Sequence, residues 1–330
     1  MTAKQLFLAT LALAATTTTI YYLFKTPQST PSSLKAFLAF KRKHNRSHST
    51  KAEFLYRFSI FQSNLQKIDT HNKKKRSFTM EVNKFADFTF EEFKNKFLSK
   101  KPIAFKPFKK EREVTNNSKD WVAEKKVSRV KNQEQCGSCW AFSTTGSMES
   151  AYAIYKNEDL EFSEQELVDC AGDYGNDGCD GGIMSAAYDY IIDNSIANEN
   201  YRYTGRDGRC KSSRYPNNRK TVALYTVINP VDVDGLVAAV NKQPVSVAIE
   251  VQDDFMFYSG GIYESDDEDC GGALNHGVLA VGFSDGQNGF IKVKNSWGPD
   301  WGEEGYVRMS MGTGSGTCGI ANDSDVYPSL

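Results

Sequence analysis

The chain has 330 residues, of which 40% are hydrophobic, so it can bury a sizeable core, and collagen, a coiled coil and a wholly disordered chain are excluded. The net charge of -1 hides a division, because residues 1–113 carry 23 Lys or Arg against 8 Asp or Glu, whereas residues 114–330 carry 17 against 33. Two parts of opposite charge are expected to face each other. Nucleic-acid binding is the weaker alternative, because the lysines of the basic part alternate with Phe and Leu in helical patterns.

Residues 1–24 are predicted to be a targeting segment. Lys4 precedes an apolar run over residues 6–15, and the small-residue pattern at 12–14 offers a signal-peptidase site. A signal anchor is the alternative, since more apolar residues follow the four threonines at 16–19, but those threonines favour cleavage. Either way the chain enters the secretory pathway, with an acidic vacuole such as the lysosome, or secretion, as its destination.

In the oxidising secretory pathway, the sequons of the chain can be glycosylated and its cysteines can form disulfides. Sequons at Asn45, Asn116 and Asn322 predict a glycoprotein. Seven cysteines leave one thiol unpaired if the others form disulfides: Cys136, Cys139, Cys170, Cys179, Cys210, Cys270 and Cys318. A zinc site would need a second ligand pair near the C-x-x-C motif, and no other C-x-x-C occurs, so neither a metal nor a cofactor is expected.

The basic part, residues 25–114, is predicted to be helical and detachable. Apolar residues at alternating spacings of four and three from Phe54 to Ile68 line one seam of a helix of about 24 residues, although this seam alone fits any amphipathic packing helix. A shorter helix is expected over residues 34–40. Between Lys96 and Asn117 the periodicity disappears, which predicts an exposed linker open to proteolysis.

The acidic part, residues 115–330, is predicted to be an α+β domain with two lobes. Helical patterns dominate residues 121–223, including one helix over 139–156. Strand patterns follow at 221–227, 245–251, 277–283, 290–294 and 306–310. Because a helix N-terminus favours a negative charge, Cys139 at the start of its helix is expected to have a lowered thiol pKa. His276 is the only histidine after Val114, so these two residues form a candidate Cys/His couple on opposite lobes.

Several motifs carry a specific resemblance to a known family. Six residues of the basic part match the ERFNIN pattern of cathepsin L-type propeptides: Glu53, Arg57, Phe61, Asn64, Ile68 and Asn72. A second propeptide motif is matched by Asn83, Phe85 and Asp87 but has Glu81 in place of its first glycine. Residues 133–142, 274–277 and 294–298 resemble the nucleophile, histidine and asparagine segments of papain and the cathepsins. The chain is thus identified as similar to papain-family cysteine peptidases, made as a preproenzyme.

The resemblance implies a papain-like fold, a helical lobe against a β-barrel-like lobe with an N-terminal helical inhibitory propeptide, and a Cys-His-Asn site. Cys139 would attack a peptide carbonyl, and His276 would exchange protons with the thiol, the leaving amine and water. Gln133 and the backbone N–H of Cys139 would stabilise the oxyanion, and Asn295 would orient the imidazole under Trp297. The implied disulfides are Cys136–Cys179, Cys170–Cys210 and Cys270–Cys318, which leave Cys139 free.

The resemblance also implies a substrate cleft. Gly181 and Gly182 would let a substrate backbone lie close. An apolar pocket for the second residue upstream of the cut would be lined by Ile183, Met184, Ala248, Leu274 and Gly277. Asp323 falls near the floor of that pocket, where it could accept a basic side chain.

These residues predict a cysteine endopeptidase that acts on proteins and peptides as a monomer, with its own propeptide as an intramolecular inhibitor and without nucleic acid. Only 30 residues lie between Cys179 and Cys210, which is too few for the occluding loop of cathepsin B-like exopeptidases. Propeptide removal is expected at acidic pH, since protonation of acidic groups weakens attraction between the two charged parts. The alternative is a catalytically inactive papain-like binding or inhibitory protein, although Cys139, His276 and Gln133 are all present.

Overall fold

The computed structural model describes residues 31–101, 118–228, 233–265, 270–286, 288–312, 314–321 and 325–330. The chain forms two compact units, one of residues 1–70 with 86–88 and one of residues 71–85 with 89–330. The predicted targeting segment 1–24 and the sequons Asn116 and Asn322 lie outside the described residues. No helix among the described residues is long and apolar enough to cross a membrane.

The described part of the first unit is built on two helices, α2 (Pro31–Lys43) and α3 (Lys51–Lys73), the second of which ends in the other unit. The predicted seam of α3 packs on Phe37, whose ring centroid lies 5.3–5.4 Å from those of Phe54, Phe58 and Phe61. Both helices predicted from apolar spacing are therefore confirmed, and aromatic packing holds them together.

Polar members of the ERFNIN pattern hold the segment 86–88 against α3. Arg57 donates to the carbonyl of Asp87 at 3.0 Å, and the side-chain amide of Asn64 donates to the carbonyls of Ala86 and Phe88 at 3.0 and 2.9 Å. Asp87 also pairs with Arg46 at 3.3 Å. These contacts satisfy backbone carbonyls that no helix or strand pairs, which explains why fixed polar residues recur on one helix face.

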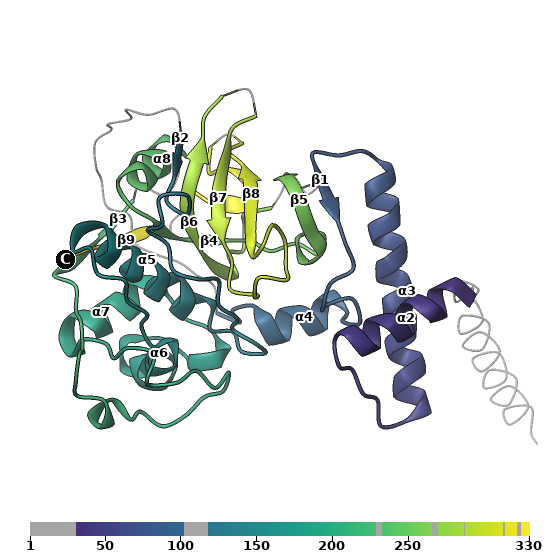
Figure 1. Cartoon of the computed structure of the whole chain (residues 1–330), viewed down its shortest axis with the longest axis horizontal. Coiled ribbons are helices and arrows are strands. Elements are labelled where there is room, and N and C mark those ends of the chain that lie inside the picture. Colours follow the sequence, from purple (N-terminus) through teal and green to yellow (C-terminus); the bar gives the residue numbers. More distant parts are fainter. Residues whose placement is uncertain are drawn as a thin grey trace, which may run out of the picture. The chain divides into compact units, whose positions relative to one another are not determined.

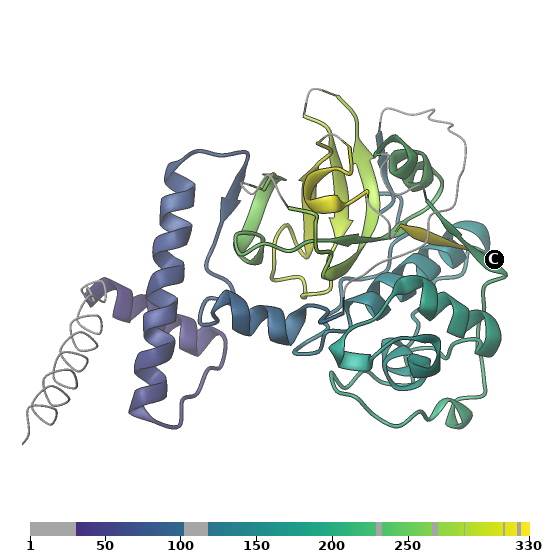
Figure 2. The ribbon, with the colours of Figure 1, turned by 180° about the vertical axis from the view of Figure 1, so that it is seen from behind.

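The described helices of the second unit are α4 (Phe90–Phe97), α5 (Cys139–Tyr155), α6 (Glu164–Cys170), α7 (Met184–Asn194) and α8 (Val233–Lys242). Helices α5, α6 and α7 lie together on one side of the strands, whereas α8 lies beside β2 (Figure 1; from behind in Figure 2). Thr89 and Glu92 form a capping box at the start of α4, each side chain accepting from the other's backbone N–H at 3.1 and 3.0 Å. The predicted helix beginning at Cys139 is confirmed, whereas α4 and α8 were not predicted.

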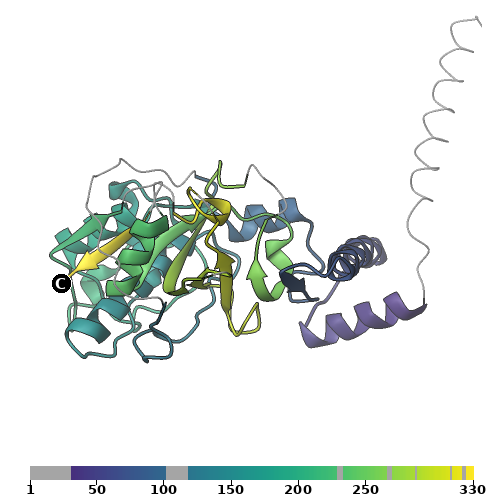
Figure 3. The same cartoon turned by 90° about the horizontal axis from the view of Figure 1, so that it is seen from above.

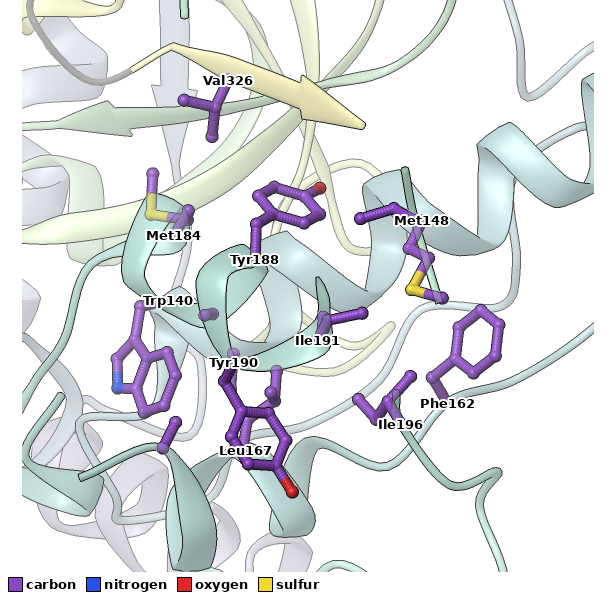
Figure 4. Close-up of a cluster of buried hydrophobic side chains, with 14 of the residues drawn as sticks. Trp140, Met148, Phe162, Leu167, Met184, Tyr188, Tyr190, Ile191, Ile196 and Val326 are labelled. Carbon is purple, nitrogen blue, oxygen red and sulfur yellow. The ribbon is translucent and has the colours of Figure 1, made fainter. Parts of the chain in front are cut away.

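Helix α5 is the centre of the helical lobe. It is buried from Cys139 to Tyr152 and packs against α6 and α7 in an apolar cluster that includes Met148, Leu167 and Tyr188. Figure 4 shows these side chains converging between the helices. A helix with no polar face cannot form on the surface, so tertiary burial and not amphipathicity stabilises α5.

The strands form one sheet in the order β1-β5-β8-β7-β6-β4-β9-β3, with β2 paired to β6. Their bounds are β1 (Phe78–Met80), β2 (Ser118–Asp120), β3 (Leu224–Val227), β4 (Val245–Ile249), β5 (Tyr258–Tyr263), β6 (His276–Ser284), β7 (Phe290–Lys294), β8 (Tyr306–Ser310) and β9 (Val326–Ser329). Figure 3 shows the last strand, in yellow, at the edge of the lobe beside the C mark. All five predicted strands are confirmed, but four more were missed because they are short or carry glycines and polar residues.

The predicted exposed linker is wrong over its first residues. Phe97, Leu98 and Ser99 are buried, and residues 102–117 lie outside the described part of the chain. Phe97 ends α4 and shares its buried face with Phe93, four residues earlier. Leu98 and Ser99 lie beyond the helix, and periodicity cannot detect burial by contacts with distant parts of the chain.

Candidate active site

Cys139 is placed at the first position of α5 by a tight approach of the preceding turn. A Cβ on Gly137 would lie 2.5 Å from the carbonyl oxygen of Cys179, so only glycine fits there. The N–H of Gly137 donates to that same carbonyl at 2.9 Å, and a disulfide joins Cys136 to Cys179. Among the described cysteines Cys139 alone is free, and it is buried.

His276 begins β6 on the opposite lobe. The β4–β6 pairing aligns it with Ile249, and its Nε2 lies 2.8 Å from the side-chain oxygen of Asn295, which directly follows β7. Its ring stacks on Trp297 with centroids 4.7 Å apart. Its Nδ1 has no hydrogen-bond partner among the described residues and is therefore the ring atom free for proton exchange.

Gly277 brings the two lobes into contact at this point. A Cβ on Gly277 would lie 3.1 Å from the Cα of Trp140 and 3.3 Å from the carbonyl carbon of Cys139. The start of β6 therefore lies directly against the start of α5, with His276 as the neighbour of this contact. The absence of a side chain at Gly277 is what allows the candidate thiol and imidazole to approach.

Gln133 is fully buried and is held by hydrogen bonds from several sides. Its backbone N–H donates to the carbonyl of Ser296 at 2.8 Å, and its side-chain oxygen accepts from the hydroxyl of Ser296 at 2.6 Å. Its side-chain amide donates to the carbonyls of Cys136 and Phe97, both at 2.8 Å. The amide is thus aimed at the turn before Cys139, where an oxyanion donor is needed.

The electrostatics of this covered site differ from the sequence-based expectation. Burial raises the pKa of the Cys139 thiol to about 11, although backbone N–H groups of Gly277, Trp140 and Ser99 act in the opposite direction. Burial lowers the pKa of His276 to about 4, against the effect of its hydrogen bond to Asn295. Desolvation outweighs the helix N-terminus here, so the covered site favours a neutral thiol and a neutral imidazole.

Residues 97–100 cover the site. The N–H of Ser99 donates to the carbonyl of Asn275 at 2.8 Å, and the N–H of Lys100 donates to the carbonyl of Asp180 at 3.0 Å. A Cβ on Gly181, whose φ is +124°, would lie 2.2 Å from the hydroxyl of Ser99. The segment therefore lies across both lobes, next to the candidate nucleophile, through backbone contacts that a peptide of any sequence could make.

Aromatic rings hold the residues that precede this segment on the strand lobe. Phe85 and Phe93 lie edge-on to Trp297 with centroids 5.6 and 5.1 Å apart, and both pack against Phe97. Lys84 donates to the carbonyl of Trp297 and pairs with Asp300 at 3.3 Å. Glu81 stands where the motif has glycine, but its φ is not positive, so the position does not require glycine. Its backbone N–H donates to the carbonyl of Phe257 at 2.9 Å, so this segment still pairs with the strand lobe.

The predicted substrate residues divide into three groups. Met184, Ala248 and Leu274 belong to one buried apolar cluster that also contains Val326. Figure 4 shows Met184 and Val326 in this cluster. Ile183 is the N-cap residue of α7 and directly precedes Met184. Gly181 faces Ser99, but a Cβ on Gly182 would lie 2.6 Å from the ring of Trp140, so Gly182 serves packing within the helical lobe. Asp323 lies outside the described residues.

The remaining cysteines form disulfides in the same pairs that the resemblance implies. They join Cys136 to Cys179, Cys170 to Cys210 and Cys270 to Cys318. In the described ranges no group of three or more His, Cys, Asp or Glu side chains is placed to bind a metal ion.

Sequence reasoning missed several residues that build the site. Ser99 and Phe97 come from the segment expected to be a linker, and Ser296 and Tyr203 belong to no periodic pattern. The hydroxyl of Tyr203 donates to the carbonyl of Gln133 at 2.7 Å. The position of Ser296 between Asn295 and Trp297 was the one available signal; nothing in the sequence marks Tyr203.

Two family models match the chain. The family model described as "Papain family cysteine protease" matches residues 115–328, and the model described as "Cathepsin propeptide inhibitor domain" matches residues 37–93. The chain belongs to the papain family of cysteine peptidases. It is a papain-like zymogen with an inhibitory propeptide, and its fold is the papain-like α+β fold.

Relatives and solved structures agree with this assignment over most of the chain. A pro-cathepsin H from Medicago truncatula is 42% identical over 89% of this chain and 85% of its own length. A cathepsin L-like proteinase from Fasciola hepatica is 39% identical over 86% of this chain and 89% of its own. The structure of digestive procathepsin L 3 from Tenebrio molitor larval midgut superposes with a TM-score of 0.80 at 37% identity, covering 90% of this chain and 99% of that one.

Proposed function

We propose that the processed protein is a cysteine endopeptidase in which Cys139 is the nucleophile, His276 the acid and base, and Asn295 the residue that orients the imidazole. The observation that carries this proposal is the contact of the starts of α5 and β6 through Gly277, together with the His276–Asn295 hydrogen bond of 2.8 Å. The free Nδ1 of His276 is the atom assigned to proton exchange with the Cys139 sulfur.

The reaction proceeds through an acyl-enzyme. Once the cleft is open, the proton of the Cys139 thiol passes to His276, and the thiolate attacks the peptide carbonyl carbon. The C–N bond breaks as His276 returns the proton to the leaving amine, and a thioester remains. Water then attacks the thioester carbonyl while His276 takes a proton from the water. The C–S bond breaks, the carboxylic acid product is released, and the proton returns to Cys139 as the free thiol.

The oxyanion of each tetrahedral intermediate is stabilised by donors already in place. The side-chain amide of Gln133 and the backbone N–H of Cys139 carry this role, and loss of one such donor costs on the order of 3 kcal/mol. In the zymogen the amide of Gln133 donates to the carbonyl of Phe97. The propeptide thus uses the donor that a substrate carbonyl needs, which contributes to inhibition.

The apolar cluster of Met184, Ala248 and Leu274 supports a pocket for an aliphatic or aromatic side chain upstream of the cleaved bond. Ile183 and Gly277 complete its rim, and Asp323 is proposed to add acceptance of a basic side chain. Cleavage of a Leu-Arg reporter against an Arg-Arg reporter tests the last point, since Asp323→Ala should lower only the Arg-Arg rate. An unchanged ratio in that variant contradicts a role for Asp323.

We propose that residues 1–24 direct the chain into the secretory pathway, that residues 25–114 form the propeptide and that residues 115–330 form the mature peptidase. The papain-family match beginning at residue 115 and the three disulfides support this division. Glycosylation and delivery to a lysosome or secretion follow as expectations. The N-terminus of the mature protein, read by mass spectrometry, tests the boundary.

Activation is proposed to be faster at acidic pH. Between the ordinary histidine pKa of 6.5 and the value of about 4 in the covered site, an uncovered imidazole takes up a proton that the covered one does not. Falling pH in this window therefore favours the open state. Equal processing rates at pH 7 and pH 4 contradict this proposal.

The proposed activity is tested with the zymogen and its Cys139→Ala variant at pH 4. We expect the native chain to process itself and to cleave a peptide reporter blocked at its N-terminus, which an aminopeptidase cannot cleave. The variant should remain unprocessed, and after processing by a trace of native enzyme it should be inactive. Cleavage by the processed variant would contradict the nucleophile assignment, and an inactive native enzyme would favour a binding or inhibitory protein.

A further inference from the structure

Tyr203 links the two chain segments that carry the proposed oxyanion donors. Its hydroxyl donates to the backbone carbonyl of Gln133 at 2.7 Å and lies 2.7 Å from the hydroxyl of Ser138. Ser138 is the N-cap residue of α5 and directly precedes Cys139. One phenol oxygen therefore joins the segment of Gln133 to the start of the nucleophile helix.

The direction of these hydrogen bonds follows from the number of protons available. A carbonyl cannot donate, so the single proton of Tyr203 goes to Gln133, and Ser138 must donate to the phenol oxygen. Burial is the main cause that raises the pKa of Tyr203, so the phenol keeps its proton across the range in which a peptidase acts. The result is a chain of two hydrogen bonds with a fixed direction, from the hydroxyl of Ser138 to Tyr203 and from Tyr203 to the carbonyl of Gln133.

The loop that carries Tyr203 is anchored on both sides. Tyr201 donates to the carboxylate of Asp169 at 2.6 Å, and the N–H of Thr204 donates to the side chain of Gln165 at 2.8 Å. The ring of Tyr203 lies edge-on to Phe142 on α5, with centroids 4.9 Å apart. Because its neighbours are held, the phenol acts as a rigid spacer and not as a mobile surface side chain.

Gln133 is thereby held from opposite directions. Ser296 fixes its backbone N–H and its side-chain oxygen, as described above, whereas Tyr203 fixes its backbone carbonyl. Hydrogen-bond donors to an oxyanion must be in place before charge develops, and small displacements weaken them strongly. The distance between the amide of Gln133 and the N–H of Cys139 is therefore sensitive to the phenol bridge.

We propose that Tyr203 is a positioning residue for peptide hydrolysis, whose hydroxyl sets the spacing between the two oxyanion donors. It acts through Gln133 and Ser138 and does not contact the substrate. This inference rests on the proposed function, in which Gln133 and the Cys139 N–H stabilise the oxyanion. It adds a residue that belongs to none of the matched motifs.

The test compares Tyr203→Phe, which removes only the hydroxyl, with Tyr174→Phe as the matched control, which removes a phenol hydroxyl that donates to Asp193 at 2.9 Å and has no part in the site. For Tyr203→Phe we expect kcat to fall about tenfold while KM changes less than twofold, because the bridge acts on the transition state. Binding of a peptide aldehyde, whose adduct carries an oxyanion, should weaken by a similar factor. Alkylation of Cys139 by iodoacetamide forms no oxyanion and should keep its rate within twofold. Tyr174→Phe should leave all three ratios near their native values.

Two further variants separate failure of this inference from failure of the proposed function. Gln133→Ala should lower kcat by about 10²-fold, and adding Tyr203→Phe to it should have little further effect. An unchanged kcat in Gln133→Ala would remove the oxyanion assignment itself. If Gln133→Ala is impaired but Tyr203→Phe is not, or if Tyr203→Phe slows alkylation in proportion to kcat, the inference is overturned. Ser138→Ala, which removes the first donor of the hydrogen-bond chain, should lower kcat severalfold and tests the bridge independently of the folding of Tyr203→Phe.

Discussion

The two sides of the candidate active site are built by different means. Cys139 is fixed by local chain structure, namely the start of a helix, a close turn at Gly137 and the disulfide of Cys136. His276 is fixed by sheet register and by stacking on Trp297, 4.7 Å away. The nucleophile side is held by covalent and polar contacts, whereas the imidazole side depends on strands and rings brought together from distant parts of the chain.

This difference explains which interactions keep the zymogen inactive. Phe85 and Phe93 pack on Trp297 at the imidazole side, whereas residues 97–100 lie across both sides through backbone hydrogen bonds. Aromatic burial supplies affinity, and backbone pairing supplies coverage of the site. The following predictions separate these contributions.

Both sides of the site must be present for catalysis. His276→Ala should lower kcat/KM for a peptide reporter by about 10⁴-fold, because no group then accepts the thiol proton or protonates the leaving amine. The variant is assayed after processing by a trace of native enzyme, and its circular dichroism provides the folding control. A loss of less than tenfold would show that His276 is not the partner of Cys139.

The aromatic contact should dominate propeptide binding. Phe93 is fully buried, and its truncation in Phe93→Ala should cost about 3–5 kcal/mol, which corresponds to more than 100-fold weaker inhibition. The measurement is the inhibition constant of the separate propeptide, residues 25–114, against the mature enzyme. The half-buried residue Phe90, whose ring centroid lies 6.3 Å from that of Phe93, provides the control variant Phe90→Ala, and equal losses in both would contradict an aromatic anchor.

The covered imidazole should make the zymogen less stable in acid. Since the pKa of His276 is about 4 in the folded zymogen and 6.5 when exposed, the unfolded state binds more protons between these values, and stability falls as pH decreases through this window. The expected loss is at most about 3 kcal/mol. It is measured by denaturant unfolding of the Cys139→Ala zymogen at pH 7 and pH 4. In the double variant Cys139→Ala, His276→Gln the loss of stability between pH 7 and pH 4 should be smaller. An equal loss in both proteins would show that groups other than His276 cause it.

The exposed ion pairs should contribute least. Lys100 and Asp180 are 2.5 Å apart but about half exposed, at 50% and 58%, so Lys100→Ala should weaken inhibition by less than about fivefold. The small effect should vanish in concentrated salt, because exposed charges are screened. A loss as large as that of Phe93→Ala would mean that charge complementarity, and not aromatic packing, holds the propeptide.

The sequence predicts the two sides of the site unequally well. The start of α5 follows from Gly137 and the run after Cys139, and the predicted strands around His276 are present. Strand pairing, however, depends on distant partners, so β5, β9 and the register of β6 could not be derived. The expected fall in the pKa of Cys139 is wrong for a similar reason, because the prediction considered the helix N-terminus but not the burial of the thiol in the folded chain, which raises the pKa.

The covered segment shows the same limit. Leu98 and Ser99 have no periodic pattern, and Ser99 contacts Asn275, which lies far downstream in sequence. Phe97, by contrast, lies four residues after Phe93 on the buried face of α4, a spacing that predicts a helix. Tyr203 is likewise invisible from the sequence, since its role depends on two partners, Gln133 and Ser138, that lie far upstream. Local signals identify residues that build an element, whereas residues that join elements appear only in the folded chain.

The central claim is that one reduced thiol carries the chemistry and that the propeptide covers it. Iodoacetamide labelling followed by peptide mass spectrometry, performed in parallel on the zymogen and the processed enzyme, tests both parts. We expect a single modified residue, Cys139, whose modification abolishes activity in the processed enzyme and proceeds at least tenfold more slowly in the zymogen. Activity that survives stoichiometric modification of Cys139, or labelling that is equally fast in both forms, would contradict the claim.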